Sequence, residues 1–192
     1  MSSTDALLAR ARSQRRGTRL TPEPRLRSVI LTCMDARIDP VALFGLEAGD
    51  AHVLRNAGAR VTPDVLRSIA LSQAVLGTRE VLVLGHTGCG LHERTEEELV
   101  HTIRLHSGHE PATPLGAFRD LDTAVEESVA ALRDCPFLAQ RDAIHGFVYE
   151  LDTGEVRPTA TAAHSKTAGA SRAHRSGLDM LRADVLNLNR RR

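Results

Sequence analysis

The sequence predicts an α/β fold: a mostly parallel central β-sheet of about four parallel strands, with an antiparallel edge strand, flanked by helices. Three observations lead to this prediction. Runs of β-branched and leucine residues, such as 28–31 and 81–84, are typical of strands buried on both faces. Segments with apolar residues at helical spacing separate these runs, and this alternation favours parallel strands joined by right-handed crossovers. The 192 residues are enough for one domain with a substantial core.

The first elements of the chain alternate between helix and strand. Alanine, leucine and arginine over residues 5–16 predict a helix capped by Ser3 or Thr4, and the prolines at 22 and 24 end it. The following elements are expected as a strand at 27–32, a short helix at 41–46 and a strand at 52–55.

A longer helix is predicted from Thr62, a favourable N-cap residue, with Pro63 at the first helical position. Apolar residues continue at helical spacing up to Gly77. A third buried strand follows at 80–85.

The second half of the chain contains two further predicted helices and a further strand. Thr95 to Glu98 has the pattern of a capping box and predicts a helix over 95–106. The segment 107–116 is rich in Gly, Pro and His and is expected to be a loop, followed by a helix from about 115 to 132. The last predicted elements are a strand at 144–151 and a hairpin turn at 152–155 that leads into Val156.

Three regions are predicted: an N-terminal helical arm (1–24), a zinc-binding α/β catalytic domain (25–157) and a basic, flexible C-terminal arm (158–192) with a short amphipathic helix near its end. The net charge is +1, but the two ends are basic and the segment 31–156 is acidic. Aromatic residues make up only 3% of the chain, too few for base stacking, so we expect no nucleic-acid partner.

The cysteine count and the hydropathy pattern indicate a cytoplasmic protein. Three cysteines, an odd number, argue against a disulfide framework and for a reducing compartment. No apolar run approaches the roughly 18–20 residues of a membrane span, and the first residues lack the pattern of a secretory signal. We therefore expect no membrane partner.

Two short motifs contain good ligands for a divalent metal. Cys33-Met34-Asp35-Ala36-Arg37 and His86-Thr87-Gly88-Cys89-Gly90 each follow an apolar strand, so their side chains should meet at the carboxyl edge of the sheet. Cys33, Cys89 and His86 supply two thiolates and an imidazole. Structural zinc is normally closed by four protein ligands, whereas catalytic zinc keeps three and leaves one position for water. The count of three indicates an open zinc site.

Together with Arg55-Asn56-Ala57-Gly58 after the second strand, the two motifs resemble the β-class carbonic anhydrases over roughly residues 25–155. The resemblance implies one Zn²⁺ per subunit, held by Cys33, His86 and Cys89. It implies reversible hydration of carbon dioxide to bicarbonate, in which a zinc-bound hydroxide is the nucleophile. Asp35 and Arg37 would form a catalytic dyad that orients this hydroxide. It also implies a homodimer or a higher even oligomer, with the N-terminal helix lying across the partner.

Several alternatives stay open at this point. In some family members the aspartate that matches Asp35 binds zinc as a fourth ligand in a closed, inactive state. His92, three residues after Cys89, is an alternative metal ligand. Relatives with a similar site hydrolyse carbonyl sulfide or carbon disulfide. A non-catalytic zinc-binding or thiol-sensing regulatory module is a further alternative.

Overall fold

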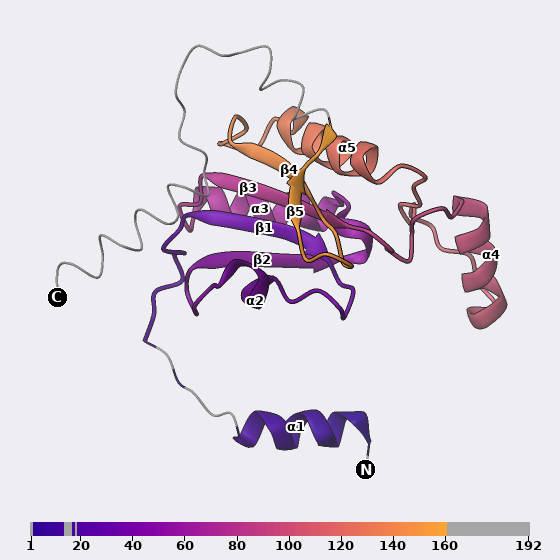
Figure 1. Ribbon diagram of the computed structural model, residues 1–192, viewed down its shortest axis with the longest axis horizontal. Helices are drawn as coiled ribbons and strands as arrows, with labels where there is room; N and C mark the ends of the chain where they lie inside the picture. The colour runs from indigo at the N-terminus through magenta and orange to yellow at the C-terminus, as the bar shows by residue number, and fades with distance from the viewer. Residues whose placement is uncertain (1, 14–16, 18, 161–192) are drawn as a thin grey trace.

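The computed structural model describes residues 2–13, 17 and 19–160, and it contains a five-stranded sheet with helices packed against it (Figure 1). The strand order is β2-β1-β3-β4-β5. Strands β2, β1, β3 and β4 run parallel, and β5 pairs antiparallel with β4. The strands span Ser28–Cys33 (β1), Ala51–Asn56 (β2), Glu80–His86 (β3), Ile144–Tyr149 (β4) and Val156–Pro158 (β5). The predicted parallel sheet with an antiparallel edge strand is confirmed.

The order of the strands brings the two ligand-bearing motifs together. β1 and β3 are neighbours inside the sheet, and Thr32 of β1 is in register with Leu84 of β3. Because the strands are parallel, their last residues, Cys33 and His86, reach the same edge of the sheet. Both strands are largely buried, as their runs of valine, leucine and isoleucine predict.

The described helices begin where local capping groups satisfy their first backbone N–H groups. They are α1 (Ser3–Ser13), α2 (Pro40–Phe44), α3 (Pro63–Ala74), α4 (Glu96–Ser107) and α5 (Leu121–Asp134), with a 3-10 turn η1 (Ala57–Ala59). The Thr62 hydroxyl accepts the Val65 N–H at 3.3 Å, and Thr95 and Glu98 form the predicted capping box. Both predicted caps are confirmed.

Two predicted helix starts are wrong. α1 is capped by Ser2 rather than by Ser3 or Thr4, since the Ser2 hydroxyl accepts the Asp5 N–H at 3.2 Å. α5 begins at Leu121 rather than near 115, because the Asp120 carboxylate accepts the Thr123 N–H at 2.7 Å and caps the helix there. The backbone N–H groups of residues 115–117 instead donate to the Glu96 carboxylate at the start of α4.

The main core lies between the sheet and helices α3 and α5. Leu31 of β1, Ile69 of α3 and Leu132 of α5 are all fully buried in it. Burying such a side chain stabilises the fold by about 1.5–3 kcal/mol. The core therefore fixes the two strands whose carboxyl ends carry the candidate ligands.

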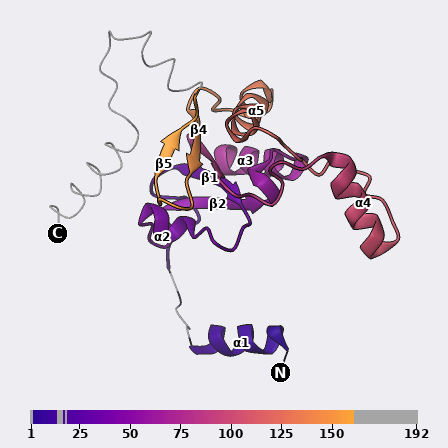
Figure 2. The same ribbon diagram turned by 45° about the vertical axis from the view of Figure 1, so that its right-hand side comes forward.

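Helices α1 and α4 stand clear of the sheet in both ribbon views (Figures 1 and 2). Neither helix has a buried residue, although each carries apolar side chains. Leu7 of α1 is 63% exposed and Leu105 of α4 is 70% exposed. Two amphipathic helices thus leave apolar surface uncovered within this chain.

Among the helices of the described ranges, none is both long enough and apolar enough to cross a bilayer. Of the predicted C-terminal arm, residues 161–192, with the amphipathic helix expected there, lie outside the described residues.

Candidate metal centre

Three buried side chains come together at the carboxyl edge of the sheet. Cys33 is the last residue of β1, His86 is the last residue of β3, and Cys89 follows three residues later in a turn. Their ligand atoms all lie within 4.8 Å of one another. The structure thus brings together the three residues that the two motifs single out. The two cysteines among them are 56 residues apart in the sequence.

The orientation of the imidazole leaves one nitrogen free to bind a cation. His86 Nδ1 lies 2.9 Å from the Thr87 carbonyl oxygen, which can only accept, so Nδ1 carries the proton. Nε2 is then an acceptor, and it is buried with no hydrogen-bond partner. Metal-binding histidines commonly donate their second ring N–H to a carbonyl in this way. The unpartnered nitrogen beside two thiols is a donor set that fits zinc.

The Cys33 and Cys89 thiols lie close enough for one to donate a hydrogen bond to the other. The hydrogen bond from the Cys89 thiol stabilises the Cys33 thiolate and lowers the pKa of Cys33 to about 4. The same bond, together with burial, raises the pKa of Cys89 well above its ordinary value. The first thiolate therefore forms readily, whereas the second needs a nearby positive charge. A divalent cation would supply that charge.

Asp35 and Arg37 form a two-point ion pair next to these ligands. Arg37 Nε donates to Asp35 Oδ1 at 2.9 Å, and Nη2 donates to Oδ2 at 2.6 Å. Nη2 also donates to the Gly88 carbonyl at 2.8 Å, which ties the two motifs together. These hydrogen bonds hold the pKa of Asp35 well below its usual range, so the carboxylate is ionised at neutral pH.

The carboxylate lies beside the ligand cluster without joining it. Asp35 Oδ2 is 4.0 Å from His86 Nε2, whereas both carboxylate oxygens are engaged by Arg37. The arrangement is that of a three-ligand site with a neighbouring acceptor. For Asp35 to become a fourth ligand, its carboxylate would have to leave this pair.

Arg55 and Gly58 support the Cys33 segment from the end of β2. Arg55 donates to the carbonyl oxygens of Cys33 at 3.0 Å and Asp35 at 2.7 Å. The Gly58 N–H donates to Cys33 Sγ at 3.4 Å. Thr87 supports His86, because its carbonyl accepts the ring N–H and its hydroxyl accepts the Leu151 N–H at 3.0 Å. Sequence reasoning missed this role of Thr87, since a backbone carbonyl leaves no signature in side-chain type.

We expect Gly58→Ala to destabilise the protein by about 2 kcal/mol or more, the range for strained backbone and an overpacked site. Gly58 has φ +71°, and an added Cβ would lie 2.8 Å from Leu91 Cδ1. Gly154→Ala is the matched control, because Gly154 has φ +75° but open space around the new Cβ. Urea unfolding of both variants separates the clash from the backbone strain. Equal losses of stability would contradict a steric role for Gly58.

The alternative ligand His92, and two other residues of ligand type, His52 and Cys135, lie outside the cluster. His92 Nε2 bonds the Arg119 carbonyl oxygen at 3.0 Å, and its ring stacks on Phe118, so it is turned to a different partner. His52 bonds Ser72 Oγ at 2.7 Å and is a structural histidine. Cys135 is a buried free thiol that is not among the three clustered ligands.

Comparisons with known proteins identify what this site resembles. A family model described as carbonic anhydrase matches residues 28–156. Beta-carbonic anhydrase 1 of Mycobacterium bovis is 39% identical over 127 residues, covering 66% of this chain and 78% of that protein. A carbonic anhydrase crystal structure from Streptococcus mutans superposes with a TM-score of 0.78 at 36% identity, covering 83% of this chain and 98% of that one. A carbon disulfide hydrolase of Saccharolobus solfataricus is 32% identical over 152 residues, covering 67% of this chain and 74% of that protein.

Proposed function

Because this chain belongs to the β-carbonic anhydrase family, we propose that it catalyses the zinc-dependent, reversible hydration of carbon dioxide to bicarbonate. Carbonic anhydrase activity, that of a carbonate dehydratase, is supported by its relatives and by the solved structures it resembles. One observation of the site carries the proposal furthest. Two cysteine thiols and one histidine imidazole are buried together, and the ionised Asp35 carboxylate lies 4.0 Å from the free Nε2 of that imidazole.

Cys33, His86 and Cys89 would hold one zinc ion per chain. Two thiolates neutralise the dication, and the neutral imidazole completes a Cys₂His set that suits zinc. When bound, zinc supplies a Lewis acid that lowers the pKa of water towards neutrality. The ligand thiols are free in the structure, and they stay free in a reducing compartment. The cytoplasm is therefore the proposed location.

Asp35 and Arg37 would position the attacking water. Arg37 keeps the Asp35 carboxylate ionised and fixed in direction, so Asp35 can accept a hydrogen bond from that water and leave its oxygen lone pair facing carbon dioxide. Arg37 is itself held by the Gly88 carbonyl, which keeps the pair against the ligand turn. Positioning of this kind acts on the nucleophile without a change in the charge of Asp35.

The test is stopped-flow hydration of carbon dioxide by protein of measured zinc content. We expect hydration well above the uncatalysed rate, in proportion to the bound zinc. Full zinc occupancy with only background hydration would overturn the proposal and would favour a non-catalytic zinc or thiol module.

Carbon disulfide or carbonyl sulfide hydrolysis is the second candidate on the same site. It is favoured by the 32% identity to the Saccharolobus solfataricus carbon disulfide hydrolase, close to the 39% for the mycobacterial relative. Measuring hydrogen sulfide release from both sulfur substrates alongside carbon dioxide hydration, on one zinc-loaded sample, distinguishes them. Faster turnover of a sulfur substrate would replace carbon dioxide as the proposed substrate.

We also expect the chain to form a homodimer or a higher even oligomer. Helices α1 and α4 expose Leu7, Leu8 and Leu105 and bury no residue within the chain, so a second copy is a natural partner for these faces. Analytical ultracentrifugation checks this expectation directly. A stable, fully active monomer at micromolar concentration would contradict it.

A further inference from the structure

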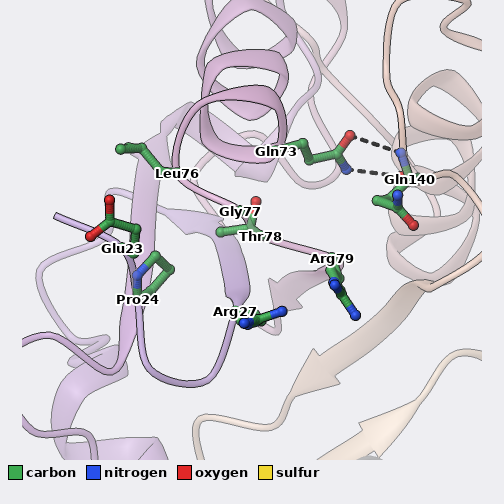
Figure 3. Close-up of a pocket in the computed structure, with 9 residues that line it drawn as sticks. All are labelled: Glu23, Pro24, Arg27, Gln73, Leu76, Gly77, Thr78, Arg79 and Gln140. Atoms are coloured by element: carbon green, nitrogen blue, oxygen red, sulfur yellow. Dashed lines mark hydrogen bonds between the residues drawn. The ribbon is translucent and has the colours of Figure 1, made fainter. Parts of the chain in front are cut away.

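A polar pocket lies at the amino-terminal edge of the sheet, opposite the candidate metal centre. Its volume is about 330 Å³, and it is lined by residues of three segments, 23–27, 73–79 and Gln140 (Figure 3). Arg27 directly precedes β1 and Arg79 directly precedes β3, whereas Cys33 and His86 end these strands. Six residue steps separate Arg27 from Cys33, which at about 3.3 Å per residue places the two sites about 20 Å apart. The pocket is therefore separate from the ligand cluster.

Two arginines on one rim of the pocket have no partner among the residues that the structure describes. The guanidinium groups of Arg27 and Arg79 form no hydrogen bond or ion pair with the rest of the described chain. Their backbones are directly joined, because the Arg79 N–H donates to the Arg27 carbonyl at 2.7 Å. Figure 3 shows both side chains along the same rim, with Glu23 on the other side of the pocket. Two unpaired positive charges on adjoining backbone positions favour an anion beside them.

The pocket walls are fixed by hydrogen bonds, so the arginines sit on a preformed frame. Gln73 is buried, and its amide both donates to the Gln140 carbonyl at 2.8 Å and accepts the Gln140 N–H at 3.0 Å. Arg27 adopts φ 50°, a left-handed conformation that is uncommon for arginine. Its N–H donates to the Pro24 carbonyl at 2.9 Å, which closes a tight turn. Unusual backbone held by its surroundings is frequent at ligand sites.

We propose that this pocket binds a small oxyanion, such as phosphate, sulfate or a carboxylate, between Arg27 and Arg79. Planar guanidinium groups match the oxygens of such anions through paired N–H donors. The Glu23 carboxylate on the opposite side disfavours a long polyanion, so the fitting ligand is compact. This site is independent of the metal centre and of the proposed hydration reaction.

Thermal unfolding in inorganic phosphate tests the proposal. Phosphate also stabilises proteins by exclusion from their surface, so the informative quantity is the difference between variants. At about 100 times the dissociation constant, specific binding should raise the unfolding midpoint of the wild type by roughly 5–10 °C beyond that of the Arg27→Gln/Arg79→Gln double variant. Arg10→Gln/Arg12→Gln on α1 removes the same charge elsewhere and should keep the full rise. Equal rises in all three proteins would overturn the proposal.

A crystal of the wild type soaked in selenate gives a second readout that needs no variant. Selenate is an oxyanion whose anomalous signal locates it directly. We expect a peak between the two guanidinium groups. A peak only at the metal centre, or none at the pocket, would contradict the site even if the double variant failed to fold.

Discussion

We expect the Cys89→Ser variant to lose its zinc and its carbon dioxide hydration together. A serine hydroxyl at this position is a much poorer zinc ligand than a thiolate, and only two of the three clustered ligands remain. Mutating a residue that only supports a metal ligand lowers metal affinity by up to about 10²-fold. Loss of a ligand itself should therefore lower the affinity by more than this. Zinc content per chain and stopped-flow hydration, measured on the same sample, check this result.

Cys135→Ser is the matched control for this variant. Cys135 is also buried and free, but it packs in the main core at the end of α5. This control should keep its zinc and its activity. The opposite pattern, with metal retained in Cys89→Ser and lost in Cys135→Ser, would sink the ligand assignment.

Metal removal should also reveal the ligand set through stability. A ligand that binds the folded state at about 1,000 times its dissociation constant stabilises it by about 4 kcal/mol, or roughly 8–16 °C for a protein of this size. A chelator should therefore lower the unfolding midpoint of the wild type and of Cys135→Ser, but leave that of Cys89→Ser unchanged. This readout does not depend on activity. It would identify a zinc site even if the substrate were not carbon dioxide.

The parallel sheet and the ligand cluster could be predicted from sequence because both depend on local patterns. Val29 to Leu31 and Val81 to Leu84 are apolar runs typical of buried strands, and the candidate ligands Cys33 and His86 come two residues after them. The start of α5 could not be predicted, because Asp120 and the residues near 115 are both plausible starting points of the helix. The structure decides for Asp120, since Glu96, 19 to 21 residues earlier, accepts the N–H groups of residues 115–117. Such a contact depends on tertiary structure and not on local pattern.

The backbone contacts around the candidate site and the pocket could not be predicted from the sequence for the same reason. The carbonyl bonds from Arg55 and the pocket rim of Arg27 and Arg79 involve backbone atoms of distant segments. A motif records side-chain types in order, and it carries no information about which carbonyl a guanidinium will reach. The Asp35–Arg37 pair was accessible because both partners lie within one motif.

The Asp35–Arg37 pair leads to the second large expected effect. The Asp35→Asn variant should keep its zinc but lose about 10²-fold or more in kcat, the range for a misplaced reacting group. Asparagine keeps the shape of aspartate and can still accept from Arg37, but it lacks the charge that orients the attacking water. Asp64→Asn is the matched control, because Asp64 forms an exposed ion pair with Arg67 on α3 and should leave kcat unchanged. Loss of zinc in Asp35→Asn would instead make Asp35 a metal ligand.

The pH profile separates positioning by Arg37 from a purely structural ion pair. Arg37 lowers the pKa of Asp35, so the pair contributes stability above the ordinary carboxyl pKa of about 4 and loses it as the pH falls through the lower folded-state pKa. Arg37 is 57% exposed, so solvent screens the pair and its contribution to folding is small. In Arg37→Gln, the Asp35 pKa returns towards its ordinary value, and the acid limb of kcat should move to higher pH with little change in stability. An acid limb that stays in place would show that Asp35 does not act as the ionised acceptor beside the metal.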